Sequence, residues 1–193
     1  MPTSLFDDFF EDLENFKIKT TETPAISPPM SRTDAMFYAA CSKAFGIHFD
    51  GTENRRLLKV VEEWLGKPYR WGGCSETGID CSCLVKSIFE EVYDISIERT
   101  SRDICEENLD PVSRDSLQEG DILCFKTRGR SFSHIGIFLK DDKFVHASRS
   151  KGVVISSLKS PYFAKRLRRC GRIAGVNSFS VAQVRVHDMM IVP

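Results

Sequence analysis

The sequence lacks an excess of either charge, a long apolar run and an N-terminal signal peptide. Its 27 basic and 27 acidic residues cancel, so no long-range field draws in a nucleic acid or an anionic membrane. No apolar run approaches the roughly 18 residues that a membrane-spanning helix needs. The opening MPTSLFDDFFEDLENFKIK is acidic where a signal peptide is basic and then apolar. We expect no nucleic-acid partner, no stable membrane insertion and a cytoplasmic location by default, with export to the periplasm or cell wall by another route left open.

The sequence also lacks the paired ligand spacing of a structural zinc site. Such sites bring ligands two to four residues apart, whereas six residues separate Cys74 from Cys81 and eleven separate His134 from His146. No metal is predicted. The seven cysteines are odd in number and irregularly spaced, and the chain is long enough to bury a core without stabilising disulfides. We therefore expect mostly free thiols in a reducing compartment.

The chain divides into four predicted parts. Residues 1–30, acidic and Phe-rich and then proline-rich, are predicted to form a tail and linker. The tail's aromatic residues recur at helical spacing, so a short helix that docks on the domain or on a partner remains open. Residues 31–52 are predicted to form an accessory helical segment, residues 53–176 the main domain, and residues 177–193 a C-terminal tail or edge strand.

The apolar pattern changes from helical to strand-like along the chain. Three stretches carry helical stripes: SRTDAMFYAACSKAFGI, TENRRLLKVVEEWLGKPY and DCSCLVKSIFEEVYDI. Beyond Gly120 the runs are short and β-rich: GDILCFK, HIGIFLK, KFVHAS, GVVISSL and RRCGRIAGV. Their spacing leaves no room for crossover helices, so the sheet should be antiparallel. The predicted fold class is α+β.

The stretch YRWGGCSETGIDCSCLV holds a candidate nucleophile. Asp80 is the predicted N-cap of a helix, which places Cys81 in the first turn, where the helix dipole and unpaired N–H groups lower a thiol pKa. A buried structural thiol is the alternative, and it suits Cys74 or Cys83 better. Side chains two residues apart diverge by about 200° around a helix, so Cys83 should not pair with Cys81.

Two histidines are candidates for the base that a thiol nucleophile needs. His134 begins HIGIFLK and His146 lies near the end of KFVHAS, and the two share a face only if the hairpin loop has an odd length. The loop lacks Asn-Gly and Asp-Gly, which favours three or five residues. We predict that both histidines lie on one face, toward Cys81. For His48 and His187 we expect surface or packing roles.

Taken together, GKPYRWGGCSETGIDCSCLV, IERTS, LQEGDILCF, SHIGIFL, KFVHAS and RRCGRI, in this order over about residues 53–173, resemble the NlpC family of papain-like cell-wall cysteine peptidases. The resemblance implies a papain-like fold, with N-terminal helices packed on a central antiparallel β-sheet. It implies that Cys81 is the nucleophile, His134 the base and His146 the residue that orients it. It requires no metal or organic cofactor. It also implies a substrate cleft that includes Tyr69, Asp80, Ser82 and Ser133.

By the same resemblance the partners are peptidoglycan stem peptides or muropeptides, cleaved between γ-D-glutamate and meso-diaminopimelate through a Cys81 thioester. Thr100 stands where relatives that recycle muropeptides tend to have aspartate, which favours an enzyme that acts on the wall. Cys83 replaces a family glycine and is expected to pack without a redox role. A papain-like acyltransferase or amidase acting on another amide or thioester, and a catalytically silent binding protein, are the alternatives. No oligomeric state is predicted.

Overall fold

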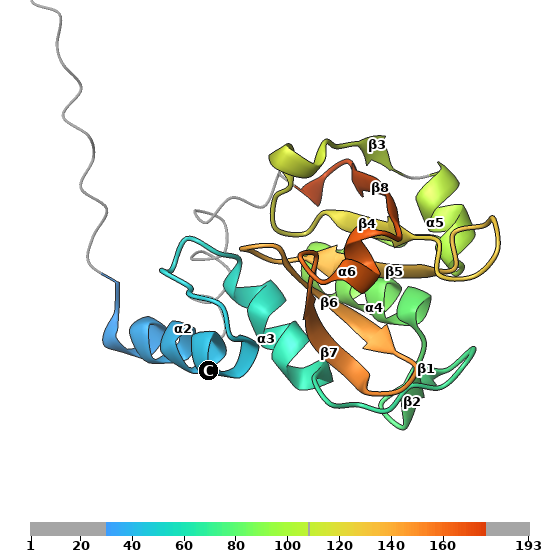
Figure 1. The fold of residues 1–193 in the computed structure, drawn as a ribbon. Helices are drawn as coiled ribbons and strands as arrows, with labels where there is room; N and C mark the ends of the chain where they lie inside the picture. Colours follow the sequence, from blue (N-terminus) through green and yellow to red (C-terminus); the bar gives the residue numbers. More distant parts are fainter. Residues whose placement is uncertain (1–29, 108, 177–193) are drawn as a thin grey trace, which may run out of the picture. The chain divides into compact units, whose positions relative to one another are not determined.

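The computed structural model describes residues 30–107 and 109–176 (Figure 1). The chain divides into two compact units, Met1–Met30 and Ser31–Pro193. The predicted tail and linker, apart from Met30, lie outside the described residues. So do the predicted C-terminal tail or edge strand, 177–193, and with it His187.

The helices begin and end at residues that satisfy their terminal backbone groups. Ser31 and Asn54 cap α2 and α3 by accepting the N–H of Asp34 and Leu57, and Gly46 ends α2 in the left-handed region with a φ of 64°. The helices are α2 (Arg32–Phe45), α3 (Arg55–Trp64), α4 (Cys81–Tyr93), α5 (Ser101–Glu107), the 3-10 helix η1 (Arg114–Ser116) and α6 (Pro161–Ala164).

A six-stranded sheet in the order β3-β8-β4-β5-β6-β7 forms the centre of the fold, and every neighbouring pair in it is antiparallel. The predicted α+β class with an antiparallel sheet is confirmed. The small hairpin of β1 (Cys74–Ser75) and β2 (Gly78–Ile79) lies apart from that sheet in the hydrogen-bond pattern. The six strands are β3 (Asp110–Pro111), β4 (Ile122–Phe125), β5 (His134–Phe138), β6 (Lys143–Ser148), β7 (Gly152–Ser157) and β8 (Leu167–Arg172).

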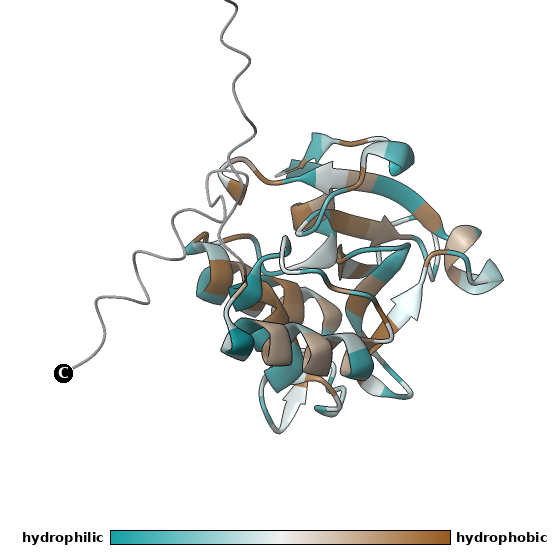
Figure 2. Ribbon diagram, turned by 90° about the vertical axis from the view of Figure 1, so that its left-hand side faces the viewer, coloured by the Kyte–Doolittle hydropathy of each residue, from teal (hydrophilic) through white to brown (hydrophobic). Residues whose placement is uncertain are grey.

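Both faces of the sheet are covered, so the interior positions of its central strands are buried. On one face α4 packs against β5 and β6, with α3 beside it. On the other face Phe125 and Phe144 pack in a second apolar cluster with Leu158 and Phe163. Figure 2 shows apolar residues concentrated along the central strands and the helices. The unbroken apolar strands of the sequence follow from this double burial.

The β5–β6 hairpin has the predicted odd loop. Phe138 pairs with Phe144, and the N–H of Leu139 donates to the carbonyl of Lys143 over 2.9 Å, which leaves three residues, 140–142, in the loop. Asp141 and Asp142 have φ values of 52° and 58°, in the left-handed region that aspartate tolerates better than most residues. The resulting register puts His134 and His146 on the same face, as predicted.

The expectation of mostly free thiols is wrong for four of the seven cysteines. Disulfides join Cys74 to Cys83 and Cys105 to Cys124, while the three remaining cysteines are free and buried: Cys41, Cys81 and Cys170. The first bridge ties β1 to the opening turn of α4, so Cys83 does more than pack. The inference of a reducing compartment rested on free thiols and loses its basis.

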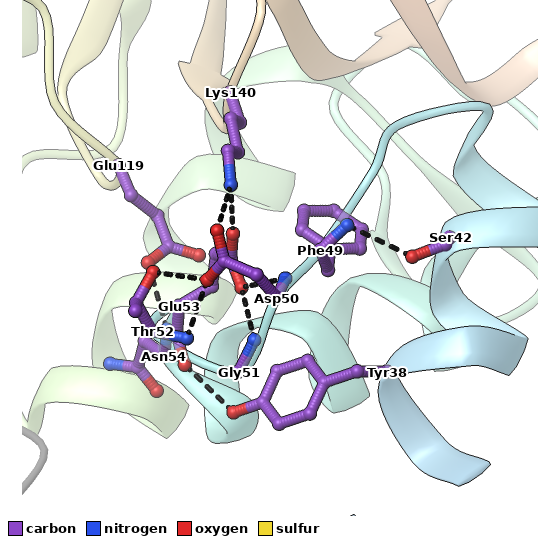
Figure 3. A network of polar contacts seen from close by, with 10 residues as sticks. All are labelled: Tyr38, Ser42, Phe49, Asp50, Gly51, Thr52, Glu53, Asn54, Glu119 and Lys140. Carbon is purple, nitrogen blue, oxygen red and sulfur yellow. Dashed lines mark hydrogen bonds and ion pairs between the residues drawn. The ribbon is translucent and has the colours of Figure 1, made fainter. Parts of the chain in front are cut away.

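A polar network joins the segment before α3 to the β5–β6 loop (Figure 3). Lys140, in the β5–β6 loop, lies 3.1 Å from Oδ2 of Asp50 and also binds the carboxylate of Glu53. The other oxygen of Glu53 accepts the N–H groups of Asp50 and Gly51. The hydroxyl of Tyr38 on α2 donates to the Glu53 carbonyl over 2.9 Å. Helix α2 is thereby held to the hairpin that carries the two histidines.

Glu119 sits at the edge of this network with one satisfied oxygen. Its Oε2 accepts the N–H of Asn54 over 2.8 Å, while Oε1 is buried without a partner among the described residues. Burial, reinforced by the negative charge of Glu53, raises the pKa of Glu119 to about 7. The neutral acid is therefore well populated near neutral pH.

We expect Glu119→Gln to remove a pH dependence of stability. A raised folded-state pKa stabilises the fold below the unfolded value of about 4.5, and this stabilisation is lost as the pH rises through about 7. Between pH 5 and pH 8 the variant should gain up to about 3 kcal/mol relative to the native chain. Urea unfolding at both pH values measures this, with exposed Glu91→Gln as control. An equal difference at both pH values would contradict the assignment.

Candidate active site

Cys81 is the first residue of α4 and is only 7% exposed. Asp80 caps the helix as predicted: its Oδ1 accepts the N–H of Cys83 over 2.8 Å. The backbone N–H of Asp80 donates to the carbonyl of Gly73 over 3.1 Å. The helix start, and the thiol with it, is therefore fixed from both sides of the cap.

Arg99 locks this cap. Its two terminal nitrogens donate to the two carboxylate oxygens of Asp80 over 3.1 and 2.9 Å, and one of them also donates to the hydroxyl of Ser82 over 2.9 Å. The N–H of Gly72 also donates to the same carboxylate over 3.0 Å. Burial alone would raise the pKa of Asp80, but the Arg99 guanidinium and the hydrogen bonds from the Cys83 N–H and the Ser82 hydroxyl together outweigh it and hold that pKa below its usual range. Asp80 stays ionised.

A chain of polar contacts joins side chains on the sheet face that carries the histidines. Nε2 of His134 lies 2.9 Å from Nδ1 of His146, and Nε2 of His146 lies 2.9 Å from the hydroxyl of Ser156 on β7. A Cβ at Gly136 would lie 3.2 Å from the Cβ of His146 and 2.6 Å from the carbonyl of Val145. The glycine therefore lets β6 bring His146 close to His134.

The thiol of Cys81 lies beside strand β5. The backbone N–H of Ile135, the residue after His134, interacts with it and lowers its pKa, but burial is the larger effect and raises that pKa to about 11. The direction opposes our sequence-based expectation, because the helix terminus is buried under the sheet and desolvation disfavours the thiolate. The resting nucleophile is a neutral thiol.

The two histidines are also neutral at rest. Burial lowers the pKa of His134 to about 4. Burial, and then the charge that His134 could carry, lowers the pKa of His146 to about 3. A neutral imidazole can accept a proton, and Nδ1 is the His134 ring nitrogen that the contact with His146 leaves for the thiol.

A cleft of about 450 Å³ opens beside His134. Of the sequence-predicted residues, Tyr69, Ser133 and His134 line it, whereas four are buried and are not among its lining residues: Asp80, Cys81, Ser82 and His146. The hydroxyl of Ser133 accepts the N–H groups of Thr127 and Arg128 over 3.0 and 3.1 Å, so it shapes the β4–β5 loop. The cleft also contains these residues that the sequence analysis did not assign to the site: Trp71, Thr100, Ser101, Arg102, Asp103, Thr127, Arg128, Ser131, Phe132 and Arg149.

Sequence reasoning missed Ser156 and the structural role of Arg99. The alternation of GVVISS gave a usable signal for Ser156: in the observed register Phe144 pairs with Ser156 and His146 with Val154, so Ser156 shares a face with His146 at a diagonal position. No local signal connects Arg99 with Asp80, because nineteen positions separate them in the chain.

Within residues 30–107 and 109–176, no cluster of three or more His, Cys, Asp or Glu side chains could hold a metal ion. Over the same residues, no helix combines the length and the apolar character needed to cross a bilayer. His48 is exposed, apart from the cleft.

A buried thiol at a helix start, next to an antiparallel sheet whose neighbouring strands carry a histidine pair, is the arrangement of the papain-like thiol peptidases. The NlpC/P60 family matches residues 66–172, which is more than half of the chain. The chain therefore belongs to the NlpC/P60 family, and it is a cysteine endopeptidase of the cell-wall hydrolase class.

Two curated relatives and two solved structures illustrate the similarity. A probable endopeptidase of Haemophilus influenzae is 33% identical over 152 residues, covering 73% of this chain and 94% of the relative. The murein DD-endopeptidase MepS/murein LD-carboxypeptidase of Escherichia coli is 37% identical over 118 residues, covering 61% of this chain and 62% of the relative. The chain thus matches less than two thirds of the latter protein's length.

An NlpC/P60 family protein from Bacillus cereus superimposes with a TM-score of 0.57 at 26% identity, over 61% of this chain and 39% of that one. The NlpC/p60 domain of the peptidoglycan hydrolase SagA superimposes with a TM-score of 0.53 at 20% identity, over 62% of this chain and 98% of that one. The second likeness shows the fold alone.

We expect alkylation of Cys81 by iodoacetamide to be slow at neutral pH and to accelerate steadily with alkalinity. Only the thiolate reacts, and its fraction rises about tenfold per pH unit below a pKa of about 11. Mass spectrometry of the Cys81 peptide at about pH 6 to 10 measures the rate, and His134→Ala is the control with an unchanged slope. An alkylation rate that does not change across neutral pH would reveal a thiolate–imidazolium pair and would contradict the assignment of a neutral resting thiol.

Proposed function

We propose that this chain hydrolyses an amide bond in peptidoglycan stem peptides, with Cys81 as nucleophile, His134 as base and His146 as the residue that orients it. The observation that carries the proposal is the series of His134, His146 and Ser156, which begins at the cleft with His134, together with the buried Cys81 thiol that contacts the N–H of the next residue, Ile135. A thiol nucleophile requires a base and a group that positions the base. The geometry supplies all three kinds of group.

One of the two tautomer arrangements that fit these hydrogen bonds supplies the base that the reaction needs. If Nε2–H of His146 donates to Ser156, then its Nδ1 accepts Nε2–H of His134. Nδ1 of His134 then carries a lone pair. The ring can take the proton of Cys81 without first losing one of its own, and the resulting imidazolium is held by His146.

The reaction proceeds in two halves. The sulfur of Cys81 attacks the scissile carbonyl carbon as its proton passes to His134, and the oxyanion forms near the start of α4. The backbone N–H groups of Cys81 and Ser82, which interact with the thiol, point into this region. His134 then protonates the leaving amine, and a thioester forms. Water, deprotonated by His134, attacks the thioester and releases the acid and the thiol.

We propose the bond between γ-D-glutamate and meso-diaminopimelate as the scissile amide, on the resemblance of the motif set. A second candidate is the pair of activities named for the Escherichia coli relative, murein DD-endopeptidase and LD-carboxypeptidase, and it is favoured by the 37% identity over 118 residues. Two disulfides support action in an oxidising place such as the periplasm or wall.

The test is incubation of the purified chain with disaccharide tripeptide, disaccharide tetrapeptide, free tripeptide and a cross-linked dimer, followed by mass spectrometry. We expect cleavage after γ-D-glutamate, reduced by at least about a thousandfold in Cys81→Ala and His134→Ala. Exposed His48→Ala is the matched control and should keep full activity.

Each other product assigns a different function. Resolution of the dimer alone would establish the DD-endopeptidase, and loss of a terminal D-alanine would establish the carboxypeptidase. Transfer of the acyl group to an added amine in preference to water would indicate a transferase. Intact substrates with every variant would leave a binding protein and overturn the proposed hydrolysis.

A further inference from the structure

The cleft carries a concentration of positive charge that the chemistry of Cys81 does not use. Three arginines line it, Arg102, Arg128 and Arg149, against one acid, Asp103. The carboxylate of Asp103 accepts a hydrogen bond from the hydroxyl of Thr100 over 2.6 Å. A local excess of two positive charges in a chain of zero net charge attracts an anionic substrate group.

Arg149 is the best placed of the three. Its guanidinium carbon lies 5.8 Å from the ring centre of Tyr69 and 5.4 Å from that of Trp71, within the range of cation–π contact. Both rings line the cleft, and Trp71 is 76% exposed. No carboxylate of the described residues forms an ion pair with Arg149. Its hydrogen-bond donors remain for a ligand.

The backbone holds this arginine in register with the two rings. The N–H of Gly66 donates to the carbonyl of Val153 over 2.9 Å, and the N–H of Val153 donates to the carbonyl of Lys67 over 2.9 Å. Gly152 has a φ of 72°, and a Cβ there would lie 2.3 Å from the Lys67 carbonyl. The β6–β7 turn that carries Arg149 is thus fastened to the segment that leads into Tyr69.

Arg128 supplies a second cation to the same space. Its backbone N–H donates to Ser133 beside His134, over 3.1 Å, which fixes the loop at its base. Burial raises the pKa of Tyr69, and the charges of Arg149 and Arg128 both act against that rise, which places both cations near the phenol. Arg102 is engaged differently, because its Nη2 donates to Ser131 over 2.8 Å.

We propose that Arg149, assisted by Arg128, is a specificity-determining residue that binds a free carboxylate beside the scissile amide, so that amidated stem peptides are discriminated against. The proposal rests on the proposed function for the identity of the substrate. A γ-linked glutamate leaves its α-carboxylate free, and diaminopimelate carries a second free carboxylate. Planar guanidinium groups match either one through paired hydrogen bonds, which a carboxamide cannot reproduce.

Binding and turnover are measured separately. In the Cys81→Ala background, calorimetry gives the dissociation constant for three disaccharide tripeptides: one with both carboxylates free, one amidated at the glutamate α-carboxyl and one amidated at the diaminopimelate side-chain carboxyl. The amidated peptide that binds at least about tenfold more weakly identifies the carboxylate that is read. Arg149→Gln should weaken binding of the free peptide about tenfold and leave that amidated peptide unchanged.

Three further variants control the interpretation. Arg128→Gln should have the same effect at smaller size, and Arg149→Lys should restore part of the preference. Exposed Arg130→Gln, on the same loop as Arg128 but outside the cleft lining, should have none. In the active enzyme, Arg149→Gln should raise KM for the free peptide and change kcat less than about twofold.

Equal weakening of all three peptides by Arg149→Gln would show a structural role through Tyr69 and Trp71 and would overturn the subsite. An intact chain that binds all three equally would overturn it too. If the native chain hydrolyses no stem peptide while the Cys81→Ala variant still prefers the free carboxylate in an Arg149-dependent way, the proposed hydrolysis fails and the subsite stands.

Discussion

The carboxylate of Asp80 is the point on which the site depends. It caps α4 by accepting the N–H of Cys83, and it holds the preceding loop by accepting the N–H of Gly72. It also accepts hydrogen bonds from both terminal nitrogens of Arg99. A buried carboxylate is costly unless it is paired and hydrogen-bonded, and here each oxygen has more than one donor. The same contacts that make the charge tolerable set the direction of the helix. Because Cys81 is the next residue, the contacts of Asp80 also set the position of Cys81.

Burial then determines how the nucleophile can work. The Cys81 thiol is buried at the start of α4, and the two imidazoles lie on the sheet face that they share with Phe125 and Phe144. Desolvation therefore disfavours the charged forms of the thiol and of both imidazoles. A resting ion pair would need its own stabilisation. With neutral partners, charge separates only as the sulfur attacks, when the N–H groups at the helix start can interact with the oxyanion. The disulfide between Cys74 and Cys83 braces the same turn, which keeps these groups in place while the charge develops.

Chemistry and recognition come from different parts of the fold. The proposed reacting groups lie on α4 and β5, with support from β6 and β7, all elements whose geometry is set by packing. Arg128 and Arg149 lie on connections at the cleft, where side chains can change without disturbing the core. This separation lets one catalytic arrangement accept substrates that differ in charge. In this chain the connections are cationic although the chain as a whole is neutral.

Local sequence patterns determined the elements: the stripe of α4, its Asp80 cap, and the odd loop that puts His134 and His146 on one face. These are predictable because helix capping and strand alternation depend on residues close together in the chain. Tertiary structure decided what depends on distant partners. The Cys105–Cys124 bridge requires α5 to lie on β4, the hydroxyl of Ser156 reaches His146 only through the β6–β7 pairing, and Arg99 meets Asp80 across a turn of the chain. The sign of the Cys81 pKa shift belongs with these, because the helix terminus alone lowers that pKa and only the packed sheet supplies the burial that raises it.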